Sequence, residues 1–241
     1  MIADWIDPRR LAPTFARQGR IHIPDFLEAA VSQDLLAALS DELPWTRTVV
    51  LGGQTYEARV EDLAAIPEST RRQLDASIAE TARAGFQYDF EAWRLSDEME
   101  AGHRGIAARM ALERLYDFLN GEAFLGFVRR LTGAASADYC DAQATRYRAG
   151  DFLNVHDDNV PGKNRLLAYV LNLTPAWRAD WGGLLLFQDA DGHVSEGYVP
   201  KLNALNLFAV PQTHAVSQVA SFVTASRLSI TGWIRSGGRP T

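Results

Sequence analysis

The sequence predicts an α+β fold in which a mainly helical N-terminal half, residues 1–136, packs on a jelly-roll-like β-barrel formed by residues 137–235. Two observations lead to this prediction. Apolar residues recur at helical spacing in the first half, whereas after residue 137 short runs of Val, Leu, Ile, Phe and Tyr alternate with turn residues. Eight short strands at such spacing are typical of a sandwich or jelly roll rather than of βαβ units.

In the N-terminal half, four segments have the apolar spacing of helices. They are Phe26–Leu43, Glu68–Ala84, Ile106–Leu119 and Glu122–Leu131. Between the first two, residues 45–51 and 54–60 have the character of strands. The Gly52-Gly53 pair between them favours a tight turn, so we expect a β-hairpin near residues 45–60.

In the C-terminal half, turn residues divide the apolar runs into eight candidate strands. These are Tyr139–Tyr147, Phe152–His156, Arg165–Leu173, Leu184–Gln188, Val194–Val199, Ala204–Phe208, His214–Val219 and Ser226–Ile234. One barrel with its supporting helices can take up 241 residues, so we expect a single domain spanning residues 1–241.

The composition is that of an ordinary globular protein, with 47% hydrophobic and 22% charged residues. A formal net charge of -6 disfavours direct binding to nucleic acid or to a membrane surface. The single cysteine, Cys140, excludes an internal disulfide and any CxxC motif. The first ten residues lack the apolar core of a signal peptide, and no apolar run approaches a membrane span. We therefore expect a cytoplasmic protein.

A candidate metal site begins at His156-Asp157-Asp158, at the end of a predicted strand. Residues i and i+2 of a strand point to the same face, so we expect His156 and Asp158 to point together into the barrel mouth. His214, 58 residues later at the start of another predicted strand, supplies a third ligand. Two imidazoles and one carboxylate leave positions open on ferrous iron, as an oxygenase requires. On the His-x-Asp triplet alone, a solvated loop histidine with two turn-forming aspartates would be the preferred interpretation.

Arg227 supports the metal hypothesis. It follows His214 by 13 residues and lies in an otherwise apolar strand. An arginine fork binds a carboxylate through two hydrogen bonds, whereas a buried guanidinium without an anion is costly. A 2-oxoglutarate molecule that chelates iron through its keto oxygen and C1 carboxylate would offer its C5 carboxylate to such an arginine. The alternative is an arginine whose head reaches solvent at the strand edge.

Two longer stretches carry further motifs. His156-Asp-Asp158 is followed by Arg165-Leu-Leu-Ala-Tyr-Val-Leu-Asn-Leu173 and Trp181-Gly-Gly183, and His214-Ala-Val-Ser-Gln-Val219 is followed by Ser226-Arg-Leu-Ser-Ile-Thr-Gly-Trp233. Over about residues 139–235 this series resembles the prolyl hydroxylase branch of the 2-oxoglutarate oxygenases. It resembles in particular the eukaryotic enzymes that hydroxylate a small-subunit ribosomal protein. Those enzymes carry a second, non-catalytic barrel that these 241 residues do not contain.

The resemblance implies a double-stranded β-helix, a jelly-roll or cupin-like fold, with the helical half packed on one sheet. It also implies cofactor contacts from Tyr147 and Ser229, and from Asn172, which stands where the relatives carry a tyrosine. Trp233 would line the pocket, and Gln143 would face the same interior. The alternative for Tyr147 and Trp233 is simple barrel core.

The activity implied by the resemblance is that of an Fe(II)- and 2-oxoglutarate-dependent dioxygenase. It would use O2 to hydroxylate an unactivated C–H bond, releasing succinate and CO2, with ascorbate as an auxiliary reductant. The implied substrate is a prolyl residue in a protein or peptide, with a ribosomal or translation protein as the candidate partner. Asn159 and Arg165, near the metal, are candidate substrate contacts, with a turn or surface role as the alternative.

Other interpretations stay open at this point. A hydroxylase of a free amino acid or small molecule would need a closed pocket with a charged group. A non-catalytic metal-binding jelly-roll module is a second alternative, although it has no need for the carboxylate anchor Arg227. A halogenase would leave a halide position where Asp158 stands. The aromatic segment Phe86, Tyr88 and Phe90 could contact substrate, but core packing is favoured.

Overall fold

The computed structural model describes residues 1–39 and 42–238. Its helices are α1 Pro8–Gln18, α2 Ala29–Ala38, α3 Val60–Ala65, α4 Glu68–Ala84, α5 Leu95–Glu100, α6 Met110–Leu119 and α7 Glu122–Thr132, with short 3-10 turns at Ala107–Arg109 and Ala179–Trp181. The strands of the first half are β1 Arg20–Ile23, β2 Thr46–Leu51, β3 Gln54–Arg59 and β4 Tyr88–Trp93. Those of the second half are β5 Tyr139–Cys140, β6 Gln143–Tyr147, β7 Phe152–His156, β8 Arg165–Asn172, β9 Leu185–Gln188, β10 Val194–Tyr198, β11 Ala204–Ala209, β12 His214–Val216 and β13 Arg227–Arg235.

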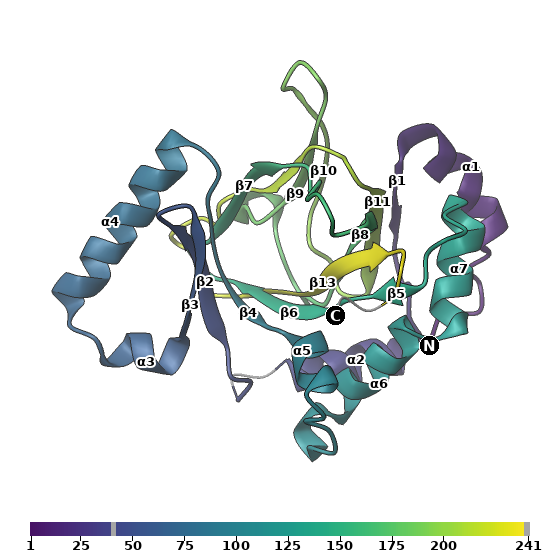
Figure 1. Ribbon diagram of the computed structural model, residues 1–241, viewed down its shortest axis with the longest axis horizontal. Helices are drawn as coiled ribbons and strands as arrows, with labels where there is room; N and C mark the ends of the chain where they lie inside the picture. The colour runs from purple at the N-terminus through teal and green to yellow at the C-terminus, as the bar shows by residue number, and fades with distance from the viewer. Residues whose placement is uncertain (40–41, 239–241) are drawn as a thin grey trace.

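The described strands form one curled antiparallel sheet, whose main path runs β1-β11-β8-β13-β6-β4-β7-β12-β9-β10. Its two end strands meet through side chains. Arg20 on β1 pairs with Glu196 on β10 at 2.6 Å, and the rings of His22 and Tyr198 stack at 4.8 Å. The curl therefore closes into the predicted jelly-roll-like barrel (Figure 1).

Strand alternation separates two cores. On β8, Tyr169 and Leu171 point to the large core shared with the helices, whereas Ala168 and Val170 pack inside the barrel with Phe187 and others. Helices α1, α2, α6 and α7 cover the outer face, while α3 and α4 lie apart beside the β2–β3 hairpin (Figure 1). Among the described residues, no helix is both long and apolar enough to cross a membrane.

Most elements confirm the sequence prediction, and the hairpin at Gly52-Gly53 forms as expected. The predicted strand Tyr139–Tyr147 is split, because Asp141 bulges between β5 and β6. Its side chain accepts the backbone N–H of Trp233 at 2.7 Å, and its carbonyl lies so close to Gly232 that a Cβ there would meet it at 2.0 Å. The strand is therefore interrupted at Asp141, where Gly232 on the neighbouring strand β13 has no side chain and leaves room for the Asp141 carbonyl.

The sequence did not predict strand β4, which bridges the two halves of the sheet. It pairs with β6 on one side and with β7 on the other. Its alternation is obscured by two buried carboxylates, Asp89 and Glu91. Arg47 forms two hydrogen bonds to Asp89, at 2.8 and 2.6 Å, and Arg146 pairs with Glu91. Because these partners lie far away in sequence, local patterning could not identify the strand.

Candidate metal and cofactor site

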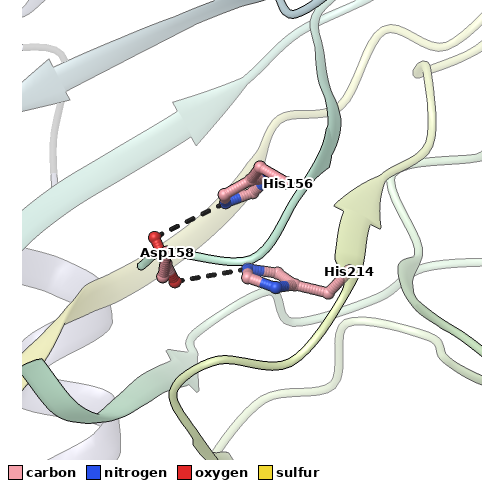
Figure 2. A group of neighbouring side chains, drawn as sticks. All are labelled: His156, Asp158 and His214. Carbon is pink, nitrogen blue, oxygen red and sulfur yellow. Dashed lines mark ion pairs between the residues drawn. The ribbon is translucent and has the colours of Figure 1, made fainter. Parts of the chain in front are cut away.

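Three predicted metal ligands converge at the barrel mouth. One ligand atom from each of His156, Asp158 and His214 lies within 4.8 Å of the others. The two oxygens of Asp158 face different rings, Oδ1 at 3.6 Å from His156 Nε2 and Oδ2 at 3.4 Å from His214 Nε2 (Figure 2). This is the geometry of a two-histidine, one-carboxylate facial set, which leaves the opposite positions of a metal ion open.

The 58 residues between the two histidines are spanned by strand pairing. His156 ends β7 and is the register partner of His214, which begins β12. Their ring centroids lie 4.1 Å apart. The antiparallel ladder thus places both imidazoles side by side.

Asp158 reaches the site by a different route from the one expected. Strand β7 ends at His156, and Asp158 lies beyond it with a φ of 63°. The prediction that strand alternation aligns the two side chains was therefore wrong, although the side chains do converge. A left-handed residue turns the chain back on itself, and Asp tolerates that conformation better than most residues.

Hydrogen bonds fix the tautomer of both imidazoles. Nδ1 of His156 lies 2.9 Å from the carbonyl oxygen of Asn154, and Nδ1 of His214 lies 2.8 Å from that of Gln212. A carbonyl only accepts, so each Nδ1 donates and each Nε2 keeps its lone pair for a metal. Burial, followed by the neighbouring His156, lowers the pKa of His214 to about 4, which favours the neutral imidazole that ligation requires.

Arg227 is buried, with 1% of its surface exposed. Among the described residues no carboxylate forms an ion pair with it, and its Nε has no hydrogen-bond partner. Burial lowers the pKa of its guanidinium. The alternative of an arginine reaching solvent was therefore wrong. A buried, incompletely satisfied guanidinium fits a carboxylate ligand such as that of 2-oxoglutarate.

The Trp-Gly-Gly motif packs against this arginine. Gly182 and Gly183 have φ values of 70° and 63°. A Cβ on Gly183 would lie 3.3 Å from Cδ of Arg227, and one on Gly182 would meet the carbonyl oxygen of Gln218 at 1.9 Å. Both glycines are needed for the chain to pass this closely.

The predicted cofactor contacts gather around Arg227. Tyr147 is its register partner on β6, is 3% exposed and stacks on Phe90 at 5.0 Å. Two residues along β13, Ser229 is fully buried, and its Oγ lies 2.8 Å from Oγ1 of Thr145. Asn172 on β8 is the register partner of Ser229. The structure thus brings Arg227, Tyr147, Ser229 and Asn172 together on three adjacent strands.

The remaining predicted residues are placed differently from one another. Arg165 stacks on Trp233, with its guanidinium carbon 3.5 Å from the ring centre, and its Nη1 donates to the carbonyl of Asp158 at 3.1 Å. A surface role for Arg165 was therefore wrong. Gln143 contacts Thr231 on the same barrel face at 3.4 Å. Asn159 is exposed, and its backbone N–H donates to the side chain of Asp157 at 2.9 Å, which is a turn contact.

For Phe86 the sequence favoured core packing over a substrate contact. Its ring lies 5.6 Å from that of His156, and 48% of its surface is exposed. Tyr88 is half-buried and Phe90 is buried, so core packing holds for the end of this segment and fails at its start. The sequence signal that could have identified this side chain is the aromatic residue at every second position from Phe86 to Phe90, which is the spacing of one face of a strand.

Part of the chain is similar to known proteins. Residues 142–235 match the model of the 2OG-Fe(II) oxygenase superfamily. Prolyl 3-hydroxylase OGFOD1 of Mus musculus is 35% identical over 119 residues, which cover 46% of this chain and 21% of that protein. Prolyl 3-hydroxylase sudestada1 of Drosophila melanogaster is 33% identical over 109 residues, covering 40% of this chain and 20% of that protein. The chain thus spans about a fifth of the length of these relatives.

Solved structures share the fold over nearly the whole chain. A Pseudomonas putida prolyl-4-hydroxylase has a TM-score of 0.60 at 18% identity, covering 96% of this chain and 100% of that one. A Trichoplax adhaerens prolyl hydroxylase, in complex with a hypoxia inducible factor peptide fragment, has a TM-score of 0.64 at 16% identity, covering 95% and 90%. Residues 142–235 thus match the 2OG-Fe(II) oxygenase superfamily, whose cofactor and co-substrates are Fe(II), 2-oxoglutarate and O2, and the cluster of His156, Asp158 and His214 fits such a metal.

Proposed function

We propose that this protein is an Fe(II)- and 2-oxoglutarate-dependent dioxygenase that hydroxylates an unactivated C–H bond. His156, Asp158 and His214 would hold the metal, and Arg227 would bind the C5 carboxylate of 2-oxoglutarate. The observation that carries this proposal is the buried guanidinium of Arg227, which lacks a carboxylate partner among the described residues. A purely structural metal site has no use for such a group.

The residues present fit both groups. Bound Fe(II) with 2-oxoglutarate and O2 would supply the oxidant for C–H hydroxylation, with succinate and CO2 as co-products and ascorbate as an auxiliary reductant. The chain itself would bind and orient. Tyr147, the register partner of Arg227, would offer its hydroxyl to the same carboxylate, and Ser229 and Asn172 on the adjacent strands would line the pocket beside it. No side chain is required as a general base.

The substrate proposed is a prolyl residue of a protein or peptide. The names of the two curated relatives support this choice. The mouth also offers exposed apolar surface beside the metal ligands, since Phe86, whose ring lies 5.6 Å from that of His156, and Val160, two residues after Asp158, are each nearly half exposed. An open apolar rim suits a polypeptide, whereas a free amino acid would require an enclosed pocket. A ribosomal or translation protein in the cytoplasm remains the proposed partner.

The proposed extent of the domain is residues 1–241. One apolar cluster joins Phe15 of α1, Leu115 of α6 and Phe124 of α7 with Ile230 of β13. Helices of the first half and strands of the second thus share one core, which supports a single folding unit.

Anaerobic titration tests the cofactor chemistry without a substrate. Fe(II)-loaded protein is titrated with 2-oxoglutarate while the weak visible metal-to-ligand charge-transfer band is followed. We expect the band in the wild type, its loss in His156→Ala, and a requirement for far more 2-oxoglutarate in Arg227→Ala. His22→Ala is the control, because His22 bonds to Asn206 outside the triad. Absence of the band in iron-loaded wild type would refute the oxygenase proposal.

A second experiment addresses the substrate. Prolyl peptides, including ribosomal ones, are screened for oxygen-dependent succinate release above the uncoupled rate, and products are checked by mass spectrometry for the addition of one oxygen. Hydroxylated peptide supports the proposal. Turnover of free proline or another small molecule, with none on peptides, would favour the small-molecule alternative.

A further inference from the structure

The two histidines of the triad are oriented by the same arrangement. Each donates its Nδ1 proton to the carbonyl of the residue two positions earlier, Asn154 for His156 and Gln212 for His214. Both of these residues carry an amide side chain. In each case that amide donates to the C-terminal end of a helix from the N-terminal half.

Asn154 connects β7 to the end of α4. Its Nδ2 donates to the carbonyl oxygens of Ala82, at 3.3 Å, and Gly85, at 3.0 Å. These belong to the last turn of α4 and to the residue that caps it, where carbonyls lack helical partners. Only the amide nitrogen can donate to a carbonyl, so these contacts fix the orientation of the amide.

A second contact holds the backbone of Asn154. Its N–H donates to the carbonyl of Gln87 at 2.9 Å. Gln87 is fully buried, and its side-chain amide bonds both the N–H and the carbonyl of Val50, each at 2.8 Å. It therefore extends the β2–β4 ladder beyond its last backbone pair, Val49 with Asp89. The residue that accepts the proton of His156 is thus fixed through both its backbone and its side chain.

Gln212 connects the second histidine to α1 in the same way. Its Nε2 donates to the carbonyl of Gln18, the last residue of α1, at 3.3 Å. The following Gly19 has a φ of 66°, and a Cβ on it would lie 3.6 Å from this Nε2. The adjacent ladder holds the two segments together, because the N–H of Ala209 donates to the carbonyl of Gly19 at 2.7 Å.

We propose that Asn154 and Gln212 are positioning residues that set the ring orientations of His156 and His214, with α4 and α1 as their anchors. The inference rests on the proposed metal ligation and names the groups that orient it. Both helices lie outside residues 142–235, so the N-terminal half would contribute directly to metal affinity. Outer partners of ligating histidines commonly affect metal affinity about 10–100-fold.

Cobalt(II) binding provides the test, since its visible absorption reports ligand geometry without turnover. Asn154→Leu and Gln212→Met remove the donor while keeping size and charge similar. We expect each to raise the Kd for Co(II) by about 10–100-fold and to change the visible spectrum. Asn120→Leu is the control. Asn120 makes the same kind of contact, donating to the carbonyl of Tyr116 near the end of α6, but contacts no triad residue.

Asn120→Leu should lower the thermal midpoint and leave the Kd and spectrum unchanged. If both test variants are folded by circular dichroism and bind Co(II) as the wild type does, the positioning role is overturned. If either variant fails to fold, the positioning role is tested instead on the metal-free wild type by nuclear magnetic resonance. Both Nδ1 protons should give slowly exchanging imidazole signals in the metal-free protein, and their absence overturns the inference. Wild type that binds no Co(II) would instead refute the proposed metal site itself.

Discussion

Arg227 and Tyr147 are register partners across the β13–β6 ladder, and the guanidinium carbon of Arg227 lies 4.8 Å from the centre of the Tyr147 ring. Both side chains are buried. The aromatic face stabilises the cation only in part, because a cation–π contact is weaker than a charge-assisted hydrogen bond. The pair is thus arranged to receive an anion, and stability and binding should depend on Arg227 in opposite ways.

Arg227→Met separates those two effects. We expect the Kd for 2-oxoglutarate to rise at least about 10-fold, since hydrogen bonds to a charged group contribute about 1.5–3 kcal/mol. The thermal midpoint of the protein without 2-oxoglutarate should stay constant or rise, because an uncompensated buried charge is removed. Anaerobic titration and thermal denaturation measure the two quantities. Unchanged 2-oxoglutarate affinity would contradict the assignment of the anchor.

Gly183→Ala should affect the same anchor through packing. The new Cβ would lie 3.3 Å from Cδ of Arg227, at a φ of 63°. We expect a stability loss of about 1–2 kcal/mol from the left-handed backbone and a weaker affinity for 2-oxoglutarate. Gly192→Ala is the matched control, because its φ is 86° and nothing lies within 4 Å of the added carbon. If both variants bind 2-oxoglutarate equally well, Gly183 has only a conformational role.

Asp151 should make stability depend on pH. Burial raises the pKa of its carboxyl to about 8, well above its unfolded value. Between these two pKa values the folded state holds a proton that the unfolded state has lost. The contribution of this proton to the free energy of unfolding is therefore complete at acid pH and is lost as the pH rises from about 4 to 8. Asp151→Asn should stabilise the protein more at pH 8 than at pH 5, by an amount on the order of a few kcal/mol. Denaturant unfolding at both pH values measures the difference, and an equal effect at both would show that the carboxyl is ionised throughout.

Phe86→Ala tests the apolar wall beside His156. For a prolyl peptide that the wild type hydroxylates, we expect KM to rise about 5–10-fold, as for the loss of one aromatic contact of about 1–1.5 kcal/mol. The affinities for metal and 2-oxoglutarate should not change. Phe222→Ala is the control, since Phe222 is 68% exposed and, within the described part of the chain, its ring does not pack on a triad imidazole as that of Phe86 does. A rise in KM in both variants would indicate a general surface effect.

Local signals predicted much of the fold. Helix α4 spans Glu68–Ala84 and strand β7 spans Phe152–His156, the ranges expected from sequence. Both have periodic apolar patterns and clear boundaries, which is sufficient when the decisive interactions are close in sequence. Strand β4 was missed for the converse reason, because its buried carboxylates are neutralised by arginines on other strands.

For the site, the sequence by itself determined the chemical identities: two histidines, one aspartate and an arginine in an apolar strand. Only the tertiary structure decided how they meet. The β7–β12 register pairs His156 with His214, a left-handed turn brings in Asp158, and helix ends lie behind both imidazoles. The physical reason is range. Side-chain chemistry and strand periodicity are local properties, whereas register, burial and hydrogen-bond partners depend on segments that become neighbours only when the chain folds.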